Sequence, residues 1–272
     1  MKTNITKNQI EVLYIVQRKR RHEIAEELGI EPYQVQYLAA KFGLTRPRLE
    51  RTRPKSCYSF DESFFKKIDT EEKAYWLGFI AADGCIVDSK SKRCLQIELS
   101  SKDRGHLEKL KSAIKYDGPI HYDRKHHLTY NGKTDIFLCD MLQINHRELV
   151  KDFINLGVTP RKSKTLQPPV IRKSLIRHWI RGYFDGDGSV SIVESTNNIC
   201  GSIFGNKQVM EFISDHFRKE LDTEALSHYR KKKNGWEMCF HGNQLAKKVE
   251  RYFYRNATVF LDRKYHKFHA LD

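Results

Sequence analysis

Two segments of the sequence share one pattern: YWLGFIAADG at residues 75–84 and WIRGYFDGDG at residues 179–188. Each is a run of apolar and aromatic residues with one internal glycine, and each closes on Asp-Gly. The final aspartates, Asp83 and Asp187, are 104 residues apart. This spacing predicts two similar halves, each organised around one of these segments.

The same landmarks follow both segments in the same order. Alternating apolar residues predict a half-buried strand at 95–100, and residues 199–204 occupy the same place in the second copy. An amphipathic helical pattern comes next, followed by Asn131-Gly132 in one copy and Asn234-Gly235 in the other. Asn-Gly between strand-like segments indicates a hairpin. Each copy therefore predicts a helix, two strands, a helix, two strands and a final helix.

The predicted fold is α+β, with repeat 1 at residues 61–166 and repeat 2 at residues 167–272. Asp69 and Glu72 are three residues apart, as a capping box at the start of the first helix requires. Ser174 is the expected N-cap of the matching helix in repeat 2.

The paired aspartates fall in the last turn of their predicted helices, where the negative end of the helix dipole disfavours a carboxylate. A divalent cation would resolve this conflict. Asp83 and Asp187 could bind a hard metal through oxygen, helped by the carbonyl groups of Ala82 and Gly186. The alternative is that Asp-Gly merely ends each helix as a turn. Its occurrence in register in both copies favours the metal site.

Two glycines, Gly78 and Gly182, lie in the middle of the predicted helices. Glycine costs about 0.5–1 kcal/mol relative to alanine at such a position. A close crossing of the two helix backbones would justify that cost. The two aspartates would then emerge side by side at one end of the helix pair.

The charge of the chain predicts a polyanionic partner. The formal net charge is +15 and the isoelectric point is about 9.5. Both residues 1–60 and residues 61–272 are basic, so the excess is not a tail. Nucleic acid is the first expectation and an anionic membrane the second, although no basic amphipathic helix supports a membrane partner. No signal peptide or apolar run of membrane-span length is evident, so a soluble intracellular protein is expected.

Six cysteines are scattered through the chain without a C-x-x-C pair. In a protein without a secretory signal they are expected to be reduced and buried. No spacing of cysteine and histidine supports a zinc site.

The front of the chain, residues 1–45, resembles a helix-turn-helix DNA-binding unit. Ala25 allows close helix approach, Gly29 accepts a positive φ in the turn, and Val35 fills the shared core. Pro32 suits the first turn of the second helix, which would enter the major groove. The outward candidates on that helix are Tyr33, Gln34, Gln36 and Tyr37. A helical hairpin used only for packing is the alternative.

Residues 46–60 form a predicted linker, in which two prolines and repeated cations oppose regular structure. It is either a solvated tether or a strap along DNA phosphates. The candidate phosphate contacts are Arg46, Arg48, Arg51 and Arg53.

Residues 76–84 and 180–188 resemble the two motifs of a single-chain LAGLIDADG homing endonuclease. The similarity spans residues 61–272. It implies two αββαββα halves whose sheets form a saddle over the DNA major groove, with the motif helices at the interface between them. It also implies that a monomer with internal pseudo-twofold symmetry cleaves both strands across the minor groove and leaves short 3′ overhangs.

The resemblance assigns roles to residues at matching positions. Asp83 and Asp187 would be catalytic acids that bind the metal, normally Mg²⁺, with Mn²⁺ or Ca²⁺ able to occupy the same sites. Lys162 lies 79 residues after Asp83 and Lys264 lies 77 residues after Asp187. They match a basic residue that the family places near the active site. A polar position beside the site is matched by Ser101 and Asn206.

The sequence also departs from the family pattern. Ala81 replaces the first aspartate of the first motif, but that position is not a metal ligand. Ser101 and Asn206 differ, so the two active sites are expected to be inequivalent. The front unit is an addition similar to that of free-standing phage or bacterial members, which use an extra domain to lengthen the DNA footprint.

Polar and basic residues around the predicted strands and hairpins are candidates for DNA contact, although a solvated surface explains any one of them equally well. The candidates are Lys90, Lys92, Arg93, Gln96, Glu98, Arg124, Lys125 and Lys133 in repeat 1, and Arg230, Lys231, Lys232 and Lys233 in repeat 2.

The leading hypothesis is a sequence-specific, metal-dependent DNA endonuclease acting on a long asymmetric double-stranded site. A non-catalytic DNA-binding regulator on the same fold is one alternative, but it predicts eroded acids, and both acids are present. An RNA maturase that helps an intron to fold is the other, since a basic surface permits it. An intein-borne enzyme is less expected, because neither end resembles a splicing junction.

Overall fold

The structure is a computed structural model that describes residues 5–17, 19, 21–44, 58–130, 133–221, 223 and 229–270. The chain divides into two compact units, residues 1–55 and 56–272.

The front unit consists of short helices around a small apolar core. Helix α1 (Lys7–Glu11) continues as a π-helical turn (Val12–Val16) and is followed by α2 (Arg21–Leu28) and α3 (Pro32–Lys41). The turn between α2 and α3 contains Gly29 at φ +64°, as predicted. The unit is all-α, and its core residues are Ile10, Leu13, Ile24, Ala25, Val35 and Ala39.

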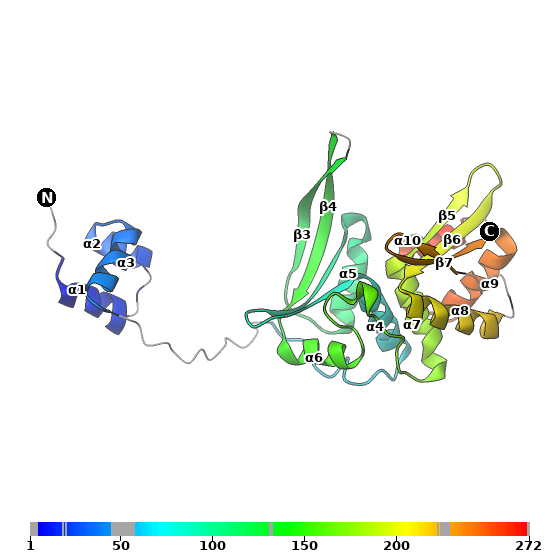
Figure 1. The fold of residues 1–272 in the computed structure, drawn as a ribbon, viewed down its shortest axis with the longest axis horizontal. Helices are drawn as coiled ribbons and strands as arrows, with labels where there is room; N and C mark the ends of the chain where they lie inside the picture. Colours follow the sequence, from blue (N-terminus) through cyan, green and yellow to red (C-terminus); the bar gives the residue numbers. More distant parts are fainter. Residues whose placement is uncertain are drawn as a thin grey trace. The chain divides into compact units, whose positions relative to one another are not determined.

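The larger unit contains the predicted pattern of helices and strands twice (Figure 1). The first copy contains α4 (Glu71–Asp83), β1 (Gly84–Asp88), β2 (Arg93–Ser100), α5 (Arg104–Ala113), β3 (Ile120–Tyr130), β4 (Lys133–Ile144) and α6 (Arg147–Asn155). The second contains α7 (Lys173–Asp187), β5 (Gly188–Val193), β6 (Asn198–Gly205), α8 (Lys207–Leu221), β7 (Tyr229–Lys232), β8 (Gly235–His241) and α9 (Asn243–Tyr254). The predicted α+β class and the αββαββα order are confirmed.

Each copy ends differently after its last helix. In the second copy, Lys264 lies in an additional helix, α10 (Asp262–Phe268). In the first, Lys162 begins a short 3₁₀ turn (Lys162–Lys164).

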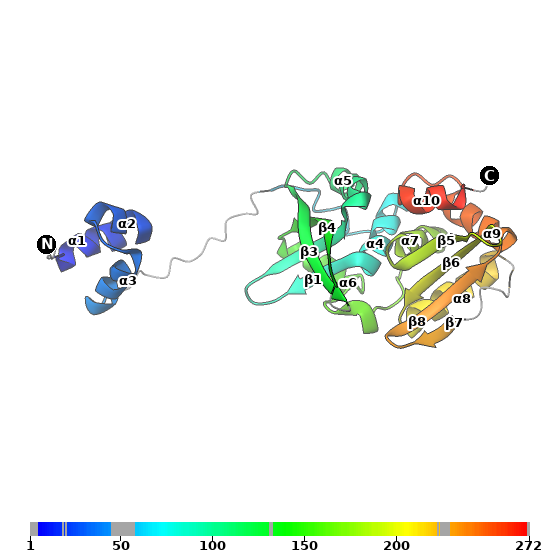
Figure 2. The ribbon, with the colours of Figure 1, turned by 90° about the horizontal axis from the view of Figure 1, so that it is seen from above.

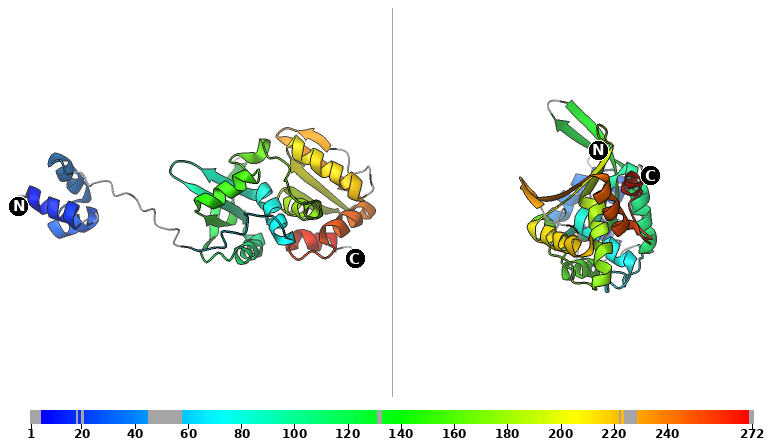
Figure 3. Two further views of the ribbon diagram at one scale, coloured as in Figure 1. Left: turned by 90° about the horizontal axis from the view of Figure 1, so that it is seen from below. Right: turned by 90° about the vertical axis from the view of Figure 1, so that its right-hand side faces the viewer.

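The strands of each copy form one four-stranded antiparallel sheet, in the orders β1-β2-β4-β3 and β5-β6-β8-β7. Side chains alternate across each strand, so Leu95 and Ile97 of β2 are buried on the helix side while Gln96 and Glu98 point to the other side. We call this second side the open face of the sheet. Figures 2 and 3 show α4 and α7 next to each other between the two sheets.

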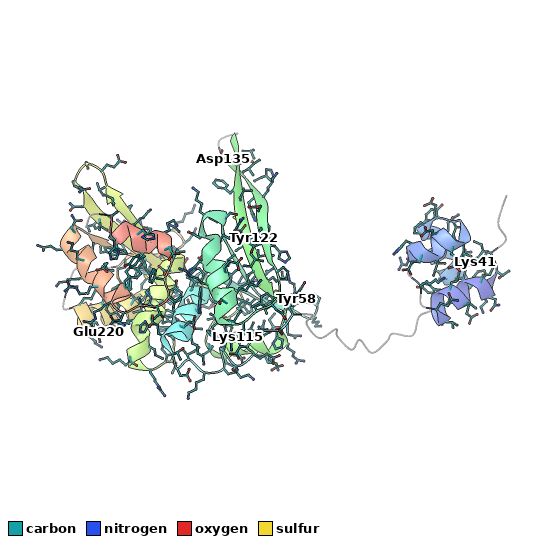
Figure 4. All side chains as sticks on the ribbon, turned by 180° about the vertical axis from the view of Figure 1, so that it is seen from behind. Lys41, Tyr58, Lys115, Tyr122, Asp135 and Glu220 are labelled. Atoms are coloured by element: carbon teal, nitrogen blue, oxygen red, sulfur yellow. The ribbon has the colours of Figure 1, made fainter. Side chains whose placement is uncertain are left out.

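The β3–β4 hairpin breaks the symmetry between the copies. Its strands have 11 and 12 residues, whereas β7 and β8 have four and seven. A bulge between His121 and Arg124, with Asp123 at φ +51°, bends the longer hairpin near its base. In Figure 4, Tyr122 lies nearer the base of this hairpin and Asp135 near its far end.

The two motif helices cross with their backbones in direct contact, at the two predicted glycines. A β-carbon at Gly78 would lie 2.0 Å from the backbone oxygen of Trp179. In the reciprocal contact, a β-carbon at Gly182 would lie 2.0 Å from the backbone oxygen of Tyr75. Only glycine fits at these positions, because the atoms that a side chain would meet belong to rigid helix backbone.

The helix starts differ from the prediction. The N-cap of α4 is Thr70, whose hydroxyl accepts a hydrogen bond from the backbone N–H of Lys73. Asp69 instead pairs with the ammonium group of Lys73 at 3.0 Å, so the predicted capping box is wrong. Helix α7 begins at Lys173 without a side-chain cap, so Ser174 already lies inside the helix.

The expectation of buried cysteines is wrong for most of those in the described part of the chain. Cys94 is buried, Cys85 is exposed, and Cys139, Cys200 and Cys239 are half-buried. Register places Cys85 opposite Gln96, on the open face, which explains its exposure. All five are free thiols.

Replacing either crossing glycine is expected to destabilise the larger unit. Gly78→Ala or Gly182→Ala must push the helices apart, which should lower the free energy of unfolding by about 3 kcal/mol or more. Urea unfolding followed by circular dichroism would measure this. Gly105→Ala in α5 is the matched control, because a β-carbon there meets nothing within 4 Å. Equal effects of all three substitutions would contradict the crossing as the cause.

Candidate functional site

Asp83 and Asp187 are the last residues of α4 and α7, and the crossing brings them to the same end of the helix pair. A β-carbon at Gly186 would lie 2.3 Å from the β-carbon of Ala82 and 3.4 Å from the carboxyl carbon of Asp83. The last turns of the two helices therefore touch, and the carboxyl group of one lies against the backbone of the other. The predicted juxtaposition of the two acids is present in the structure.

Both carboxyl groups resist ionisation, although their side chains can reach solvent. Loss of hydration, followed by the charge of Asp187, raises the pKa of Asp83 to about 6. Loss of hydration likewise raises the pKa of Asp187, against the opposing effect of Lys162. Solvent contact moderates these shifts, but their common direction has a clear cause, which is the loss of hydration at the helix ends. The charge of Asp187 adds to this effect at Asp83.

A lysine ammonium group caps the C-terminal end of each motif helix. Lys162 donates to the carbonyl oxygens of Ala82, at 2.9 Å, and Gly84. Lys264 donates to the carbonyl oxygens of Phe184 at 2.7 Å, Asp185 at 2.6 Å and Gly186 at 3.3 Å. These carbonyls lie at or beside helix ends, where unpaired acceptors and the negative end of the dipole favour a cation.

The two lysines differ in their surroundings. Lys264 is 2% exposed, and burial lowers its pKa to about 8, whereas Lys162 is half-buried with a lowered pKa. Each lysine offsets part of the unfavourable field that its helix exerts on the terminal aspartate. The structure therefore places Lys162 and Lys264 at the ends of the helices that carry the two acids.

The donor set of this site fits a hard divalent cation that shares its coordination with a substrate. Among the described residues, no three His, Cys, Asp or Glu side chains form a group that could hold a metal ion alone. Mg²⁺ in particular is usually held by one or two carboxylates, with water and phosphate oxygens completing the shell. Asp83 and Asp187 would be the protein ligands. The carbonyls of Ala82 and Gly186, also expected as ligands, already accept hydrogen bonds from the lysines.

Ser101 and Asn206 have structural partners instead of contacts with the two acids. The Ser101 hydroxyl donates to the carboxyl group of Asp140 at 2.8 Å. The Asn206 side chain accepts from the backbone N–H of Val209 and donates to the carbonyl oxygen of Leu166. None of these described hydrogen bonds reaches Asp83 or Asp187, so both residues support the fold around the site rather than its centre.

A buried carboxyl group, that of Asp185, lies two residues before Asp187 in α7. Asp185 is fully buried, and it accepts hydrogen bonds from the Tyr75 hydroxyl at 2.7 Å and the backbone N–H of Leu261 at 2.8 Å. Burial raises its pKa to about 6. The matching position in the first motif is Ala81, whose side chain cannot form the equivalent hydrogen bond to α7.

Sequence reasoning missed a pair of charged residues at the edge of the site. Arg263 forms an ion pair with Asp103 at 2.9 Å, and the charge of Asp103 contributes to the raised pKa of Asp83. Arg263 directly precedes Lys264, which is the one available signal. Its partner is 160 residues away in the sequence, so only the folded chain reveals the pair.

The candidate DNA contacts of repeat 1 divide between the two sides of its sheet. Glu98 and Arg124 lie on the open face, where they form an ion pair. Gln96 lies there too and donates to Gln143 at 2.7 Å. Lys125 is opposite Leu138 and therefore on the other side of the strand.

The remaining repeat 1 candidates lie around the strand ends. Lys92 donates to Gln143, Arg93 pairs with Asp88, and Lys90 is exposed in the turn between β1 and β2. Lys133 begins β4, but its side chain lies outside the described residues.

The repeat 2 candidates divide in the same way. Arg230 and Lys232 lie on the open face, and both pair with Glu237. Lys231 is opposite Trp236 and points to the other side, while Lys233 is exposed in the hairpin turn.

In the front unit, α3 presents a pair of tyrosines. Tyr33 and Tyr37 are 70% and 64% exposed, and Gln36 is also exposed while accepting a hydrogen bond from Arg21. Gln34 is half-buried, because its side chain caps the helix by accepting from the backbone N–H of Glu31. The linker candidates Arg46, Arg48, Arg51 and Arg53 lie outside the described residues.

Comparison with known proteins relates the first repeat to a known domain family. Residues 70–156, which run from the start of α4 through α6, match the family model of the LAGLIDADG-like domain. The chain therefore carries a LAGLIDADG-like domain, and the family resemblance seen in the sequence is confirmed. No helix in the described part of the chain is long and apolar enough to cross a membrane.

One curated relative is the replication factor C small subunit of Methanocaldococcus jannaschii, which is 29% identical over 142 residues. The match covers 50% of this chain and 7% of that protein, so the two share one segment only.

Similar solved structures include the homing endonuclease I-WcaI bound to its DNA recognition sequence, with 14% identity and a TM-score of 0.48 over 75% of this chain and 91% of that one. Meganuclease I-SmaMI bound to uncleavable DNA has 13% identity and a TM-score of 0.47, over 73% and 89%. The LAGLIDADG homing endonuclease I-LtrWI bound to target DNA has 12% identity and a TM-score of 0.45, over 77% and 90%.

The raised pKa of Asp83 predicts pH-dependent metal binding. Cations bind the carboxylate, so protons compete below about pH 6, and affinity should fall by up to about tenfold per pH unit there. Mn²⁺ titration followed by electron paramagnetic resonance between pH 5 and 8 would measure this. Asp83→Asn should weaken binding and flatten the profile, whereas Asp215→Asn, at an exposed position in α8, should do neither. A wild-type affinity that is constant over this range would contradict the assignment.

Proposed function

We propose that this protein is a sequence-specific DNA endonuclease of the homing type, which requires a divalent metal ion and breaks both strands of a long asymmetric site. The observation that carries the proposal is the pair of terminal aspartates at the helix crossing, each accompanied by a lysine. A packing interface alone gives no reason to put two acids at the unfavourable ends of two helices. The net charge of +15 supports a polyanionic substrate.

The open faces of the two sheets are the proposed DNA-binding surface. In repeat 1 this face carries Gln96, Glu98 and Arg124, and in repeat 2 it carries Arg230 and Lys232. Arginine and lysine can bind phosphate or guanine, and glutamine can read adenine. The ion pairs that these cations form with glutamates keep them on the open face, where phosphate oxygens can replace the carboxylate partner.

The proposed chemistry is phosphodiester hydrolysis. Asp83 and Asp187 would hold the metal, and a divalent cation bound there would supply water activation and charge stabilisation at the leaving oxygen. Lys162 and Lys264 add positive charge beside the phosphate, where negative charge accumulates in the transition state. Their hydrogen bonds to helix-end carbonyls fix the two ammonium groups before the substrate binds, so no reorganisation is needed during the reaction.

Both sets of catalytic residues belong to one chain, so a monomer can act on two strands. Each repeat supplies one aspartate and one lysine, related by the internal duplication. The copies differ around these residues, and the target is expected to be asymmetric for the same reason.

Cleavage should depend on both aspartates. A binding site would first be selected from a randomised DNA library with the double variant Asp83→Asn/Asp187→Asn, and then placed in a supercoiled plasmid. We expect wild type with Mg²⁺ to linearise the plasmid and each single variant to lose at least about a hundredfold in rate, with binding retained. Gel analysis of nicked and linear products would measure this.

The control for these substitutions is Asp215→Asn, which should cleave like wild type. Wild type that binds its selected site and never nicks it would support a DNA-binding regulator instead. Tighter binding of structured RNA than of DNA at the same salt concentration would support an RNA maturase.

The front unit is proposed to extend the DNA contact through α3. Tyr33→Ala/Tyr37→Ala should weaken binding of a long site by roughly tenfold, about 1.4 kcal/mol, and shorten the nuclease-protection footprint. The cleavage rate at saturating protein should not change. Val16→Ala, which removes an exposed apolar side chain outside α3, is the control. An unchanged footprint would leave α3 without a role in DNA binding.

A further inference from the structure

The segment that leads to Lys264 in repeat 2 is held by side chains of repeat 1. Glu71 accepts from the backbone N–H of Thr258 at 2.8 Å. Lys109 of α5 donates to the carbonyl oxygen of Phe260 at 3.1 Å and to the carboxylate of Asp262 at 2.7 Å. These contacts connect the repeats along the segment that leads to Lys264.

The strongest of these connections is the ion pair between Asp103 and Arg263. The guanidinium group uses both Nε, at 3.1 and 3.3 Å, and Nη2, at 2.9 Å, to bind the carboxylate. The Asp103 side chain is only 11% exposed. The Arg263 side chain is 46% exposed, but two-pronged binding to a largely buried carboxylate fixes orientation as well as distance.

The geometry of α10 transmits this constraint to the neighbouring lysine. Arg263 and Lys264 are consecutive residues in the first turn of α10, so their side chains leave the helix about 100° apart. Binding Arg263 on one side sets the rotation of the helix. Lys264 is thereby kept over the end of α7, where it reaches three carbonyl oxygens.

Among the described residues, the first repeat has no ion pair of this kind next to Lys162. Lys162 lies in a single 3₁₀ turn, and the preceding Arg161 is exposed, adopts φ +58° and forms no ion pair within the described part of the chain. The segment that follows Lys162 contacts repeat 2 through the hydrogen bond from the Asn206 side chain to the carbonyl oxygen of Leu166.

We propose that Asp103 and Arg263 are positioning residues that hold Lys264 at the end of α7, and that they control cleavage of only the DNA strand served by that lysine. The strand-selective part of this proposal rests on the proposed nuclease function. The ion pair touches neither substrate nor reacting atoms, and acts through the placement of the lysine. Repeat 1 thus governs the half of the active site that repeat 2 supplies.

The test follows each strand separately, with plasmid or end-labelled duplex carrying the selected site and Mg²⁺. Arg263→Gln and Asp103→Asn should each slow one strand, and the same one, by about tenfold to a hundredfold, so that nicked circles accumulate. The double variant should be no slower than either single variant, because both remove one interaction. Arg161→Gln, at the matching position before Lys162, should leave the ratio of the two strand rates unchanged.

A second measurement needs no DNA. Acetylation of the folded protein by a water-soluble reagent, followed by mass spectrometry, reports the accessibility of each lysine. Lys264 should react at least about fivefold faster in Arg263→Gln and Asp103→Asn than in wild type, with Lys162 unchanged, since a buried group becomes accessible when its local structure opens. Urea unfolding would establish that the variants remain folded.

The outcomes separate the two proposals. Equal slowing of both strands, or an unchanged strand ratio, would overturn strand control by the ion pair. Unchanged Lys264 acetylation in folded variants would overturn the positioning role itself. If wild type cleaves neither strand, the nuclease function fails together with strand control, and the acetylation result alone decides whether the pair positions Lys264.

Discussion

The direct contact between the backbones of α4 and α7 is the constraint on which the rest of the larger unit depends. Gly78 faces the backbone of Trp179, and Gly182 faces that of Tyr75, each without room for a β-carbon. Close approach there fixes where both helices end. It therefore fixes the separation of the terminal acids and the arrangement of the two sheets, which begin directly after them. A change in the contact between the two helices would therefore also move the two acids.

The ends of these helices combine unfavourable and favourable electrostatics. Asp83 and Asp187 stand at the negative ends of two dipoles and beside each other, and the pKa of each is raised. Lys162 and Lys264 donate hydrogen bonds to the neighbouring carbonyl oxygens, and their positive charge offsets part of the negative charge at the helix ends. What remains is a pair of carboxyl groups whose negative charge the protein only partly neutralises. Neutral residues in place of the two acids would give a more stable fold, so the paired acids lower stability in exchange for function.

Duplication supplied two similar halves, but the halves are not interchangeable. Asp185 links α7 to Tyr75 of α4, whereas Ala81 offers no reciprocal bond. The Asp103–Arg263 pair likewise has no counterpart beside Lys162 among the described residues. Both asymmetric contacts cross between the repeats, and each depends on residues that differ between the two copies. This is the physical basis for expecting the two strands of a target to be treated differently.

The sequence by itself determined the repeat, the order of its elements and the acids at the helix ends, because these follow from local periodicity, turn residues and an offset of 104 residues. It erred at the start of α4, where Thr70 rather than Asp69 caps the helix, since either residue satisfies the local rule. Only the tertiary structure placed Asn206 on a backbone carbonyl and Asp103 on Arg263. Such partners lie far apart in the chain, and no local pattern encodes which of many charged residues will meet.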